Sequence, residues 1–272
     1  NPIVLATNAT AGTLTIGNTG TAISTTFSGG VTGANNLTIN SNATTGTITF
    51  STAAINIAGV ITNTGAGTGT TTISGGIGSN VTQIIQNSTT SALTISTTAL
   101  NVNSGGTTLQ NLAGTKVLTF SAAVQGTGDL ILKNDSVTQS GVTVSGALNN
   151  IGTITNSGTG VNSVIGSLIS GIIGTNVTGV IQDSAESALE LTGANTFTSG
   201  IIIKKGILEA ATSAAALGGA GNVITLGDTS GSANAALRFQ SNIALYNNTP
   251  VNVVAGSSGT LSILGSRTTG VN

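Results

Sequence analysis

The chain has 272 residues, of which 38% are hydrophobic, 5% are charged and 2% are aromatic, and its formal net charge is −1. This hydrophobic content excludes a disordered chain, because disorder requires low hydrophobicity and usually high charge. Six Lys and Arg residues cannot form the basic surface that nucleic-acid binding needs, and the absence of Cys and His excludes disulfides, thiolate sites and a His-activated nucleophile.

No stretch of the sequence approaches the roughly 18 apolar residues of a membrane span, because Thr, Ser, Asn or Gly interrupts every run. The first four residues, Asn-Pro-Ile-Val, lack the charged start and the apolar segment of a signal peptide. If the protein is exported, we expect its signal and any anchoring domain to lie outside these residues.

Short alternating runs with Gly and Asn between them fill the first hundred residues; they lie at residues 13–16, 37–39, 47–50, 54–57 and 93–95. Alternation with period two predicts strands with one buried face. Gly and Asn tolerate the left-handed backbone of tight corners. Since Met, Trp and Cys are absent, the core must consist mainly of Val, Ile, Leu and Ala.

The sequence repeats over a long interval. Residues 27–39 align with 120–132 at an offset of 93, and residues 78–86 align with 174–182 at an offset of 96. We therefore expect two tandem units, at about residues 10–100 and 101–191, each covering about four or five turns of a solenoid with about 20 residues a turn. Phe27 and Phe120 occupy equivalent places and should stack in the core, as should Phe50, Phe197 and Phe239.

A divergent section covers residues 186–272. Leu189 and Leu191 alternate with Glu190 and predict a strand, and further short strands are expected at residues 196–198, 201–203 and 207–209, separated by glycine-bearing corners. Residues 213–217 are the best candidate in the chain for a helical turn.

This section resembles the passenger-associated transport repeat, or autotransporter-associated β-strand repeat, of bacterial autotransporters. The residues that match the pattern are Leu189, Leu191, Gly193, Asn195, Thr196, Phe197, Thr198, Gly200, residues 201–203, Gly206, Leu208, Leu217 and Gly218. The resemblance implies a right-handed parallel β-helix in an extracellular passenger domain carried on a bacterial cell surface.

The expected fold is all-β: an elongated right-handed parallel β-helix that forms one continuous solenoid over residues 1–272. Two antiparallel β-sandwiches in tandem are the alternative. Short strands and the absence of any Asn-Gly or Asp-Gly hairpin dipeptide argue against them.

Acidic residues are the remaining candidates for catalysis, since the sugar-cleaving β-helices use clusters of acids. The close pairs in the sequence are Asp129 with Asp135, Asp183 with Glu186, and Glu186 with Glu190. Asp183 and Glu186 align with Asn87 and Thr90 of the first unit, so the scaffold does not require acids there. We expect no catalytic residue and a non-enzymatic protein.

Metal and cofactor sites are not indicated either. Gly-Asp pairs occur only at Asp129 and Asp228, which is too few for the calcium sites of nonapeptide-repeat β-helices. Residues 218–221 lack the Lys-Ser/Thr of a phosphate-binding loop and should form a turn. We expect no metal and no cofactor, and we expect the single tyrosine, Tyr246, to be a surface contact.

Thr-x-Thr pairs at Thr13/Thr15 and Thr47/Thr49 would place hydroxyls on the outside of flat strands, as in ice-binding solenoids. Such ranks must recur at every turn. We do not expect them to recur at every turn, so ice binding is not favoured.

Residues 1–115 contain no charged side chain, so their outer surface carries no repulsion between molecules. We expect a structural or adhesive extracellular solenoid, a stalk or fibre segment, that associates with itself end to end or laterally or binds a host or neighbouring cell surface. The alternatives are a neutral stalk without partners and a carbohydrate-binding or carbohydrate-cleaving β-helix with a glycan partner. No nucleic-acid partner and no membrane span are expected in this chain.

Overall fold

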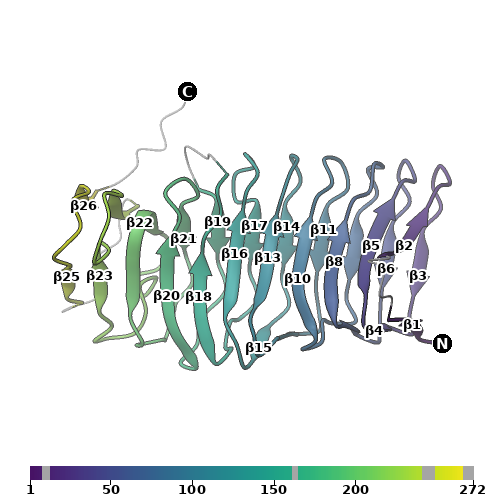
Figure 1. Cartoon of the computed structure of the whole chain (residues 1–272), viewed down its shortest axis with the longest axis horizontal. Helices are drawn as coiled ribbons and strands as arrows, with labels where there is room; N and C mark the ends of the chain where they lie inside the picture. Colours follow the sequence, from purple (N-terminus) through teal and green to yellow (C-terminus); the bar gives the residue numbers. More distant parts are fainter. Residues whose placement is uncertain (8–12, 161–164, 241–248, 266–272) are drawn as a thin grey trace.

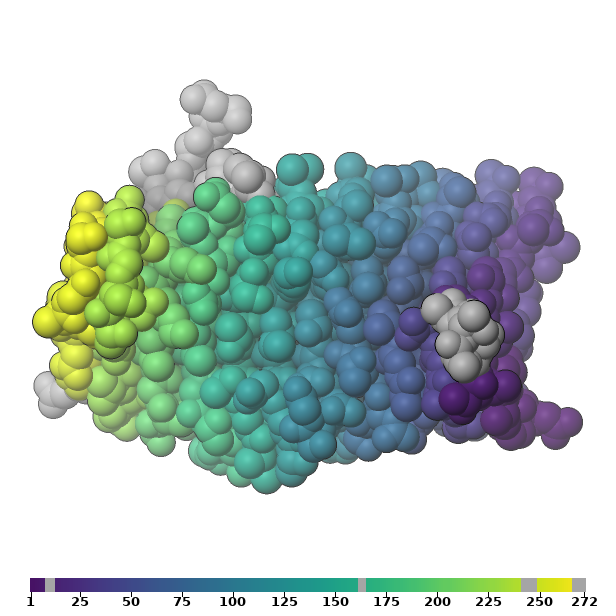
Figure 2. Space-filling view, in the orientation of Figure 1, coloured from purple at the N-terminus to yellow at the C-terminus, as the bar shows by residue number. Residues whose placement is uncertain are grey.

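The structure is a computed structural model that describes residues 1–7, 13–160, 165–240 and 249–265. Within these residues the chain forms 26 strands and no helix, and it winds into a parallel β-solenoid of about 10 turns (Figure 1). The predicted all-β solenoid is confirmed. All strand pairings in the described part are parallel, which excludes the antiparallel sandwiches. Figure 2 shows the turns following one another along the axis in the order of the sequence.

Each turn contributes to up to three sheets. Sheet A contains β1 (Ile3–Leu5), β4 (Val31–Gly33), β7 (Ile55–Ile57), β12 (Leu100–Val102) and β15 (Val124–Gly126), with single bridges at Ile77, Leu148 and Ile173. Sheet B contains β2 (Thr13–Asn18), β5 (Asn36–Ser41), β8 (Gly59–Asn63), β10 (Val81–Gln86), β13 (Thr107–Asn111), β16 (Leu130–Asn134), β18 (Gly152–Asn156), β20 (Val177–Asp183), β23 (Ile224–Leu226) and β25 (Val251–Val253).

Sheet C contains β3 (Thr25–Phe27), β6 (Ile48–Phe50), β9 (Thr71–Ile73), β11 (Leu93–Ile95), β14 (Leu118–Phe120), β17 (Val142–Val144), β19 (Ser167–Ile169), β21 (Leu189–Leu191), β24 (Ala235–Phe239) and β26 (Leu261–Leu264). The long strand β22 (Ile201–Ala210) passes around the corner. It pairs in sheet B through its first residues and in sheet C through its last.

The five strands expected in the first hundred residues are present, as β2, β5, β6, β7 and β11. Three local predictions in the divergent section were wrong. Residues 196–198 are not a strand. Residues 201–203 and 207–209 belong to one strand, because Gly206, at φ 72°, bends the backbone without ending the pairing. Residues 213–217 form a hydrogen-bonded turn and no helix.

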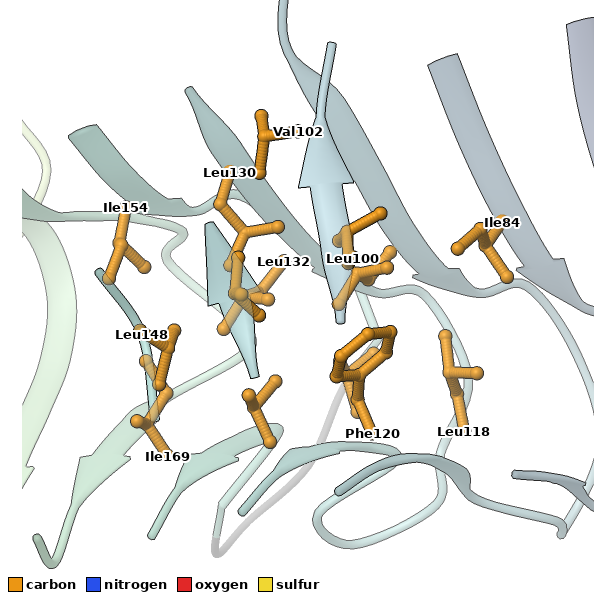
Figure 3. Packing of buried hydrophobic residues seen from close by; sticks show 14 of the residues in the cluster. Ile84, Leu100, Val102, Leu118, Phe120, Leu130, Leu132, Leu148, Ile154 and Ile169 are labelled. Atoms are coloured by element: carbon orange, nitrogen blue, oxygen red, sulfur yellow. The ribbon is translucent and has the colours of Figure 1, made fainter. Parts of the chain in front are cut away.

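The core is a narrow column of aliphatic side chains that point inward from all three sheets (Figure 3). Phe50, Phe120 and Phe197 are fully buried, and Phe27 and Phe239 pack against the column. Phe27 stacks on Phe50 with ring centroids 5.2 Å apart. The prediction that the phenylalanines fill the core is confirmed.

The long repeat corresponds to four turns. In sheet C, Phe27 lies in one inward file with Phe120, through Phe50, Ile73 and Ile95. The sequence offset of 93 between the two phenylalanines is therefore a true four-turn step in this sheet.

Sheet B does not follow the same offset. Leu37 pairs through Ile61, Ile84 and Leu109 to Leu132, whereas the alignment matches Leu37 with Leu130. The strand pairing of sheet B is therefore shifted by two residues relative to the sequence alignment. Because side chains alternate with period two, Leu130 and Leu132 both still point inward.

Polar side chains are buried at the corner where each turn passes from sheet B to sheet C. Asn63 Nδ2 donates to Gln86 Oε1 (2.8 Å) and to the Ser91 carbonyl (2.9 Å), and Asn63 Oδ1 accepts from the Thr71 hydroxyl (3.0 Å). All four residues are fully buried. Their hydrogen bonds satisfy groups that water cannot reach.

The same network recurs in the second unit. Asn156 Nδ2 donates to Gln182 Oε1 (2.8 Å) and to the Ser187 carbonyl (2.6 Å), and Asn156 Oδ1 accepts from Ser167 Oγ (2.9 Å). The two units therefore share a buried polar network as well as an apolar pattern.

Candidate functional site

Asp129 and Asp135 do not form a pair, because they flank β16 at its opposite ends. Each carboxylate instead accepts a hydrogen bond from the following turn. Asp129 Oδ1 accepts from the Thr153 amide (2.7 Å), and Asp135 Oδ1 accepts from the Thr159 amide (2.8 Å). Both residues hold neighbouring turns together.

Asp135 is also surrounded by other donors. Gln110 Nε2 donates to its Oδ2 (2.5 Å), and Lys133 Nζ lies 3.3 Å from the same atom. Burial alone would raise the pKa of Asp135, but the hydrogen bonds from Thr159 and Gln110 and the charge of Lys133 together lower that pKa from its usual value. The carboxylate stays ionised and is unsuited to be a general acid.

Asp183 and Glu186 differ in surroundings. Asp183 lies 3.2 Å from Lys205 Nζ and 3.6 Å from Lys204 Nζ. Glu186 is exposed and lines a shallow groove of about 420 Å³ whose other walls include Gly206, Ile207 and Ala235. The groove holds one carboxylate and largely apolar walls, which does not provide the two acids of glycoside hydrolysis.

Glu190 lies on a different surface from Glu186. It pairs with Glu209, and Glu209 pairs with Arg238, in a file of three charged residues on sheet C. Glu209 is fully buried and forms an ion pair with Arg238 through Oε2 and Nε. Glu209 was not among the candidate residues predicted from the sequence. The sequence signal for this file was a charged residue between two apolar residues that face inward, repeated in β21, β22 and β24.

No group of three or more His, Cys, Asp or Glu side chains in the described residues could hold a metal ion. Asp228 Oδ1 accepts a hydrogen bond from the adjacent Thr229 amide (2.8 Å). The glycine-rich residues 218–221 lie in turns, as predicted. Tyr246 lies outside the described residues.

A second groove, of about 370 Å³, lies where the turns pass from sheet A to sheet B. Its lining is almost entirely polar: Ser79, Asn80, Asn101, Asn103, Ser104 and Thr127 together with Val102 and Gly126. Amide and hydroxyl groups of this kind can bind a neutral polar ligand through hydrogen bonds.

The outer face of sheet C carries a regular array of hydroxyls. We call its central file the threonine rank; it consists of Thr26, Thr49, Thr72, Thr94, Thr119 and Thr143, each paired with the next. Paired Thr-x-Thr ranks do not recur at every turn, as expected, but a single threonine file recurs on six adjacent turns of this sheet. The alignment missed this file because an offset of 93 places Thr49 opposite Val142, whereas the strand pairing leads from Thr49 to Thr143.

A second file runs beside the threonine rank, on the residue that directly follows each of six strands of sheet C. We call it the serine rank; it consists of Ser51, Ser74, Ser96, Ser121, Ser145 and Ser170. The amide of each of these serines donates to a carbonyl of the preceding turn. A serine therefore directly follows the strand on six turns of sheet C. The hydroxyls of Ser74 and Ser121 donate to the carbonyls of Phe50 and Ile95, each at 3.3 Å.

The hydroxyls of Thr26, Thr49, Thr72, Thr94 and Thr119 form no hydrogen bond with another group in the part of the chain that the structure describes, whereas the Thr143 hydroxyl donates to the Ser140 carbonyl (2.9 Å). None of the six threonines is fully buried. These hydroxyls are open to solvent and to any partner that approaches the face.

Comparisons with protein-family models, with curated proteins and with solved structures returned no match to this chain. Among the described residues there is no helix long and apolar enough to cross a membrane.

Proposed function

We propose that this chain is a non-enzymatic structural or adhesive β-solenoid of an extracellular protein on a bacterial surface, and that it associates with itself end to end. The resemblance of residues 186–239 to autotransporter passenger repeats supports this location. The observation that carries the proposal is that, among the residues that the structure describes, inward-facing apolar side chains of the first and last turns are exposed.

Apolar side chains that face inward are exposed in the terminal turns. Leu14 pairs with the fully buried Leu37 but is itself 37% exposed. At the other end Ile263 pairs with the fully buried Leu237 and is 56% exposed. Val253 is 65% exposed. These residues are the ends of the buried files and would be covered by another turn.

The strand edges are open at the same places. Within the described residues, β2 and β3 pair on one side only at the first turn, as do β25 and β26 at the last. Unpaired edges beside exposed apolar side chains favour pairing with a further strand. Head-to-tail pairing of two copies would extend the rod, because such an interface does not close on itself. Further turns of a longer chain would fit the same ends.

The proposal is tested by measuring rod length against concentration, with light scattering and negative-stain electron microscopy. We expect wild-type rods to lengthen as concentration rises. The Val253→Lys/Ile263→Lys variant should remain short, because it places two charges in the end-to-end interface. Ile172→Lys is the control, since Ile172 is 49% exposed but lies between the ends. A wild-type protein that stays monomeric at every concentration, with both end turns ordered, would contradict the proposal.

The polar groove between sheets A and B favours a second candidate, a carbohydrate-binding solenoid. A glycan array and a reducing-sugar assay separate the two. Under our proposal neither detects a signal. Binding of one glycan class that Asn101→Ala abolishes would instead assign the groove to a sugar.

A further inference from the structure

We propose that the outer face of sheet C is an ice-binding surface, in which the threonine and serine ranks hold water molecules in the arrangement of the ice lattice. This inference is independent of end-to-end association, because it concerns the side of the rod and not its ends.

The threonine rank is regularly spaced. Neighbouring strands in a sheet lie about 4.8 Å apart, and its six threonines lie on six neighbouring strands. The serine rank lies beside it on five of these turns, from Thr49 and Ser51 to Thr143 and Ser145. Oxygen atoms in ice also repeat at regular intervals. A periodic surface fits a periodic partner at many points at once.

The side chains of the threonine rank are held rigidly. Each threonine of the rank lies between two inward-facing neighbours, and for Thr49 these are the fully buried Ile48 and Phe50. The β-branched side chain of threonine has restricted χ1 rotation. Hydroxyl and methyl groups are thus held in place before any ligand binds, which reduces the entropy lost on binding.

The hydrogen-bonding chemistry of the threonine rank matches that of water. A threonine hydroxyl both donates and accepts hydrogen bonds, as water does, and its methyl group fits between water molecules. Neither rank contains a charge, and the first charged residue of the chain is Lys116. A charged side chain would impose its own hydration shell on the water at the face.

Other partners fit the face less well. Protein interfaces depend on a few large anchors, commonly Trp, Tyr or Arg, and the ranks contain only Thr and Ser. A flat aromatic platform for a sugar ring is not formed by the five phenylalanines, which are buried in the core column or packed against it.

The face also has a definite limit. After Thr143 the central file continues with Leu168, Glu190 and Glu209. On sheet B the corresponding file has only Thr15, Thr38 and Thr62 before Ile85 interrupts it. Sheet B therefore supplies a control with the same chemistry and a shorter array.

The test is partition of the fluorescently labelled 272-residue chain into a slowly grown ice front, together with thermal hysteresis and crystal shape in a nanolitre osmometer. Wild type should enter the ice and produce faceted crystals. Thr72→Lys/Thr94→Lys should be excluded from ice, because it breaks the centre of the threonine rank. Thr38→Lys/Thr62→Lys, on sheet B, should behave as wild type.

If the sheet C lysine variant fails to fold by circular dichroism, Thr72→Val/Thr94→Val keeps the side-chain shape and removes two hydroxyls, and it should lower thermal hysteresis. Exclusion of wild type from ice would overturn the proposal, as would equal losses in the sheet B variant or unchanged hysteresis in the valine variant. Wild-type dimers that only sheet C substitutions dissociate would assign the face to a second copy of the chain.

Discussion

Gly146 lies at the corner where the chain leaves sheet C for sheet A. A Cβ atom at this position would lie 1.7 Å from the carbonyl oxygen of Ala122 in the preceding turn. The spacing between stacked strands is set by the backbone hydrogen bonds, so the turns cannot separate locally to admit a methyl group. Glycine is required here by close approach of two backbones and not by an unusual φ.

We expect Gly146→Ala to lower the free energy of unfolding by about 2 kcal/mol or more, in the range of overpacked sites. The control is Gly179→Ala, because a Cβ atom there would lie 3.9 Å from the nearest atom, in ordinary contact. That substitution should leave stability unchanged or raise it by roughly 0.5 kcal/mol. Urea denaturation followed by circular dichroism measures both, and equal values for the two variants would contradict the steric explanation.

At the scale of single elements, the buried amides connect strands of adjacent turns and the corner that follows them. Loss of the Asn63 side-chain amide would leave Gln86 Oε1 without this donor and the Thr71 hydroxyl without this acceptor, in a place where water does not reach. The Ser91 carbonyl would keep its hydrogen bond from Gln86 Nε2 (2.8 Å). The network therefore fixes how each turn passes from sheet B to sheet C.

Asn63→Leu should cost at least about 2 kcal/mol of stability, since each unsatisfied buried polar group costs roughly 1–3 kcal/mol. Thr62→Ala is the matched control. Thr62 is the adjacent residue of β8 and faces outward, so its replacement should cost less than about 1 kcal/mol. Thermal unfolding of the two variants under one set of conditions gives the comparison. A smaller loss of stability for Asn63→Leu than for Thr62→Ala would contradict this explanation.

Strand positions and facing were accessible from the sequence, because alternation reports which side of a strand is buried. Register was not. Paired threonines are 22 residues apart between Thr72 and Thr94 but 25 apart between Thr94 and Thr119, so no fixed period brings the rank together. The charged file through Glu209 was missed for the same reason, and strand β22 was divided in the prediction because Gly206 resembles a corner.

At the scale of the whole molecule, each turn contacts mainly the turns on either side of it. Stability in such a structure is close to a sum of terms within turns and between neighbours. The terminal turns have one neighbour each, and their inward side chains are partly exposed.

Amide hydrogen exchange should therefore be slowest in the central strands β13 and β14 and fastest in β25 and β26, with a graded change between them. Mass spectrometry of peptides along the chain measures this directly. Uniform exchange over all turns would show instead that the rod opens only as one unit.

The two-residue slip of sheet B has a consequence for how such chains lengthen over evolutionary time. A strand that gains or loses two residues keeps every side chain on its side of the sheet, whereas a change of one residue would turn the apolar set outward. Leu130 and Leu132 illustrate the permitted change. Insertions and deletions that survive within strands should come in even numbers unless a bulge absorbs a single residue, as between Val81 and Gln83 in β10. The corners, which have no alternation to preserve, can absorb any number.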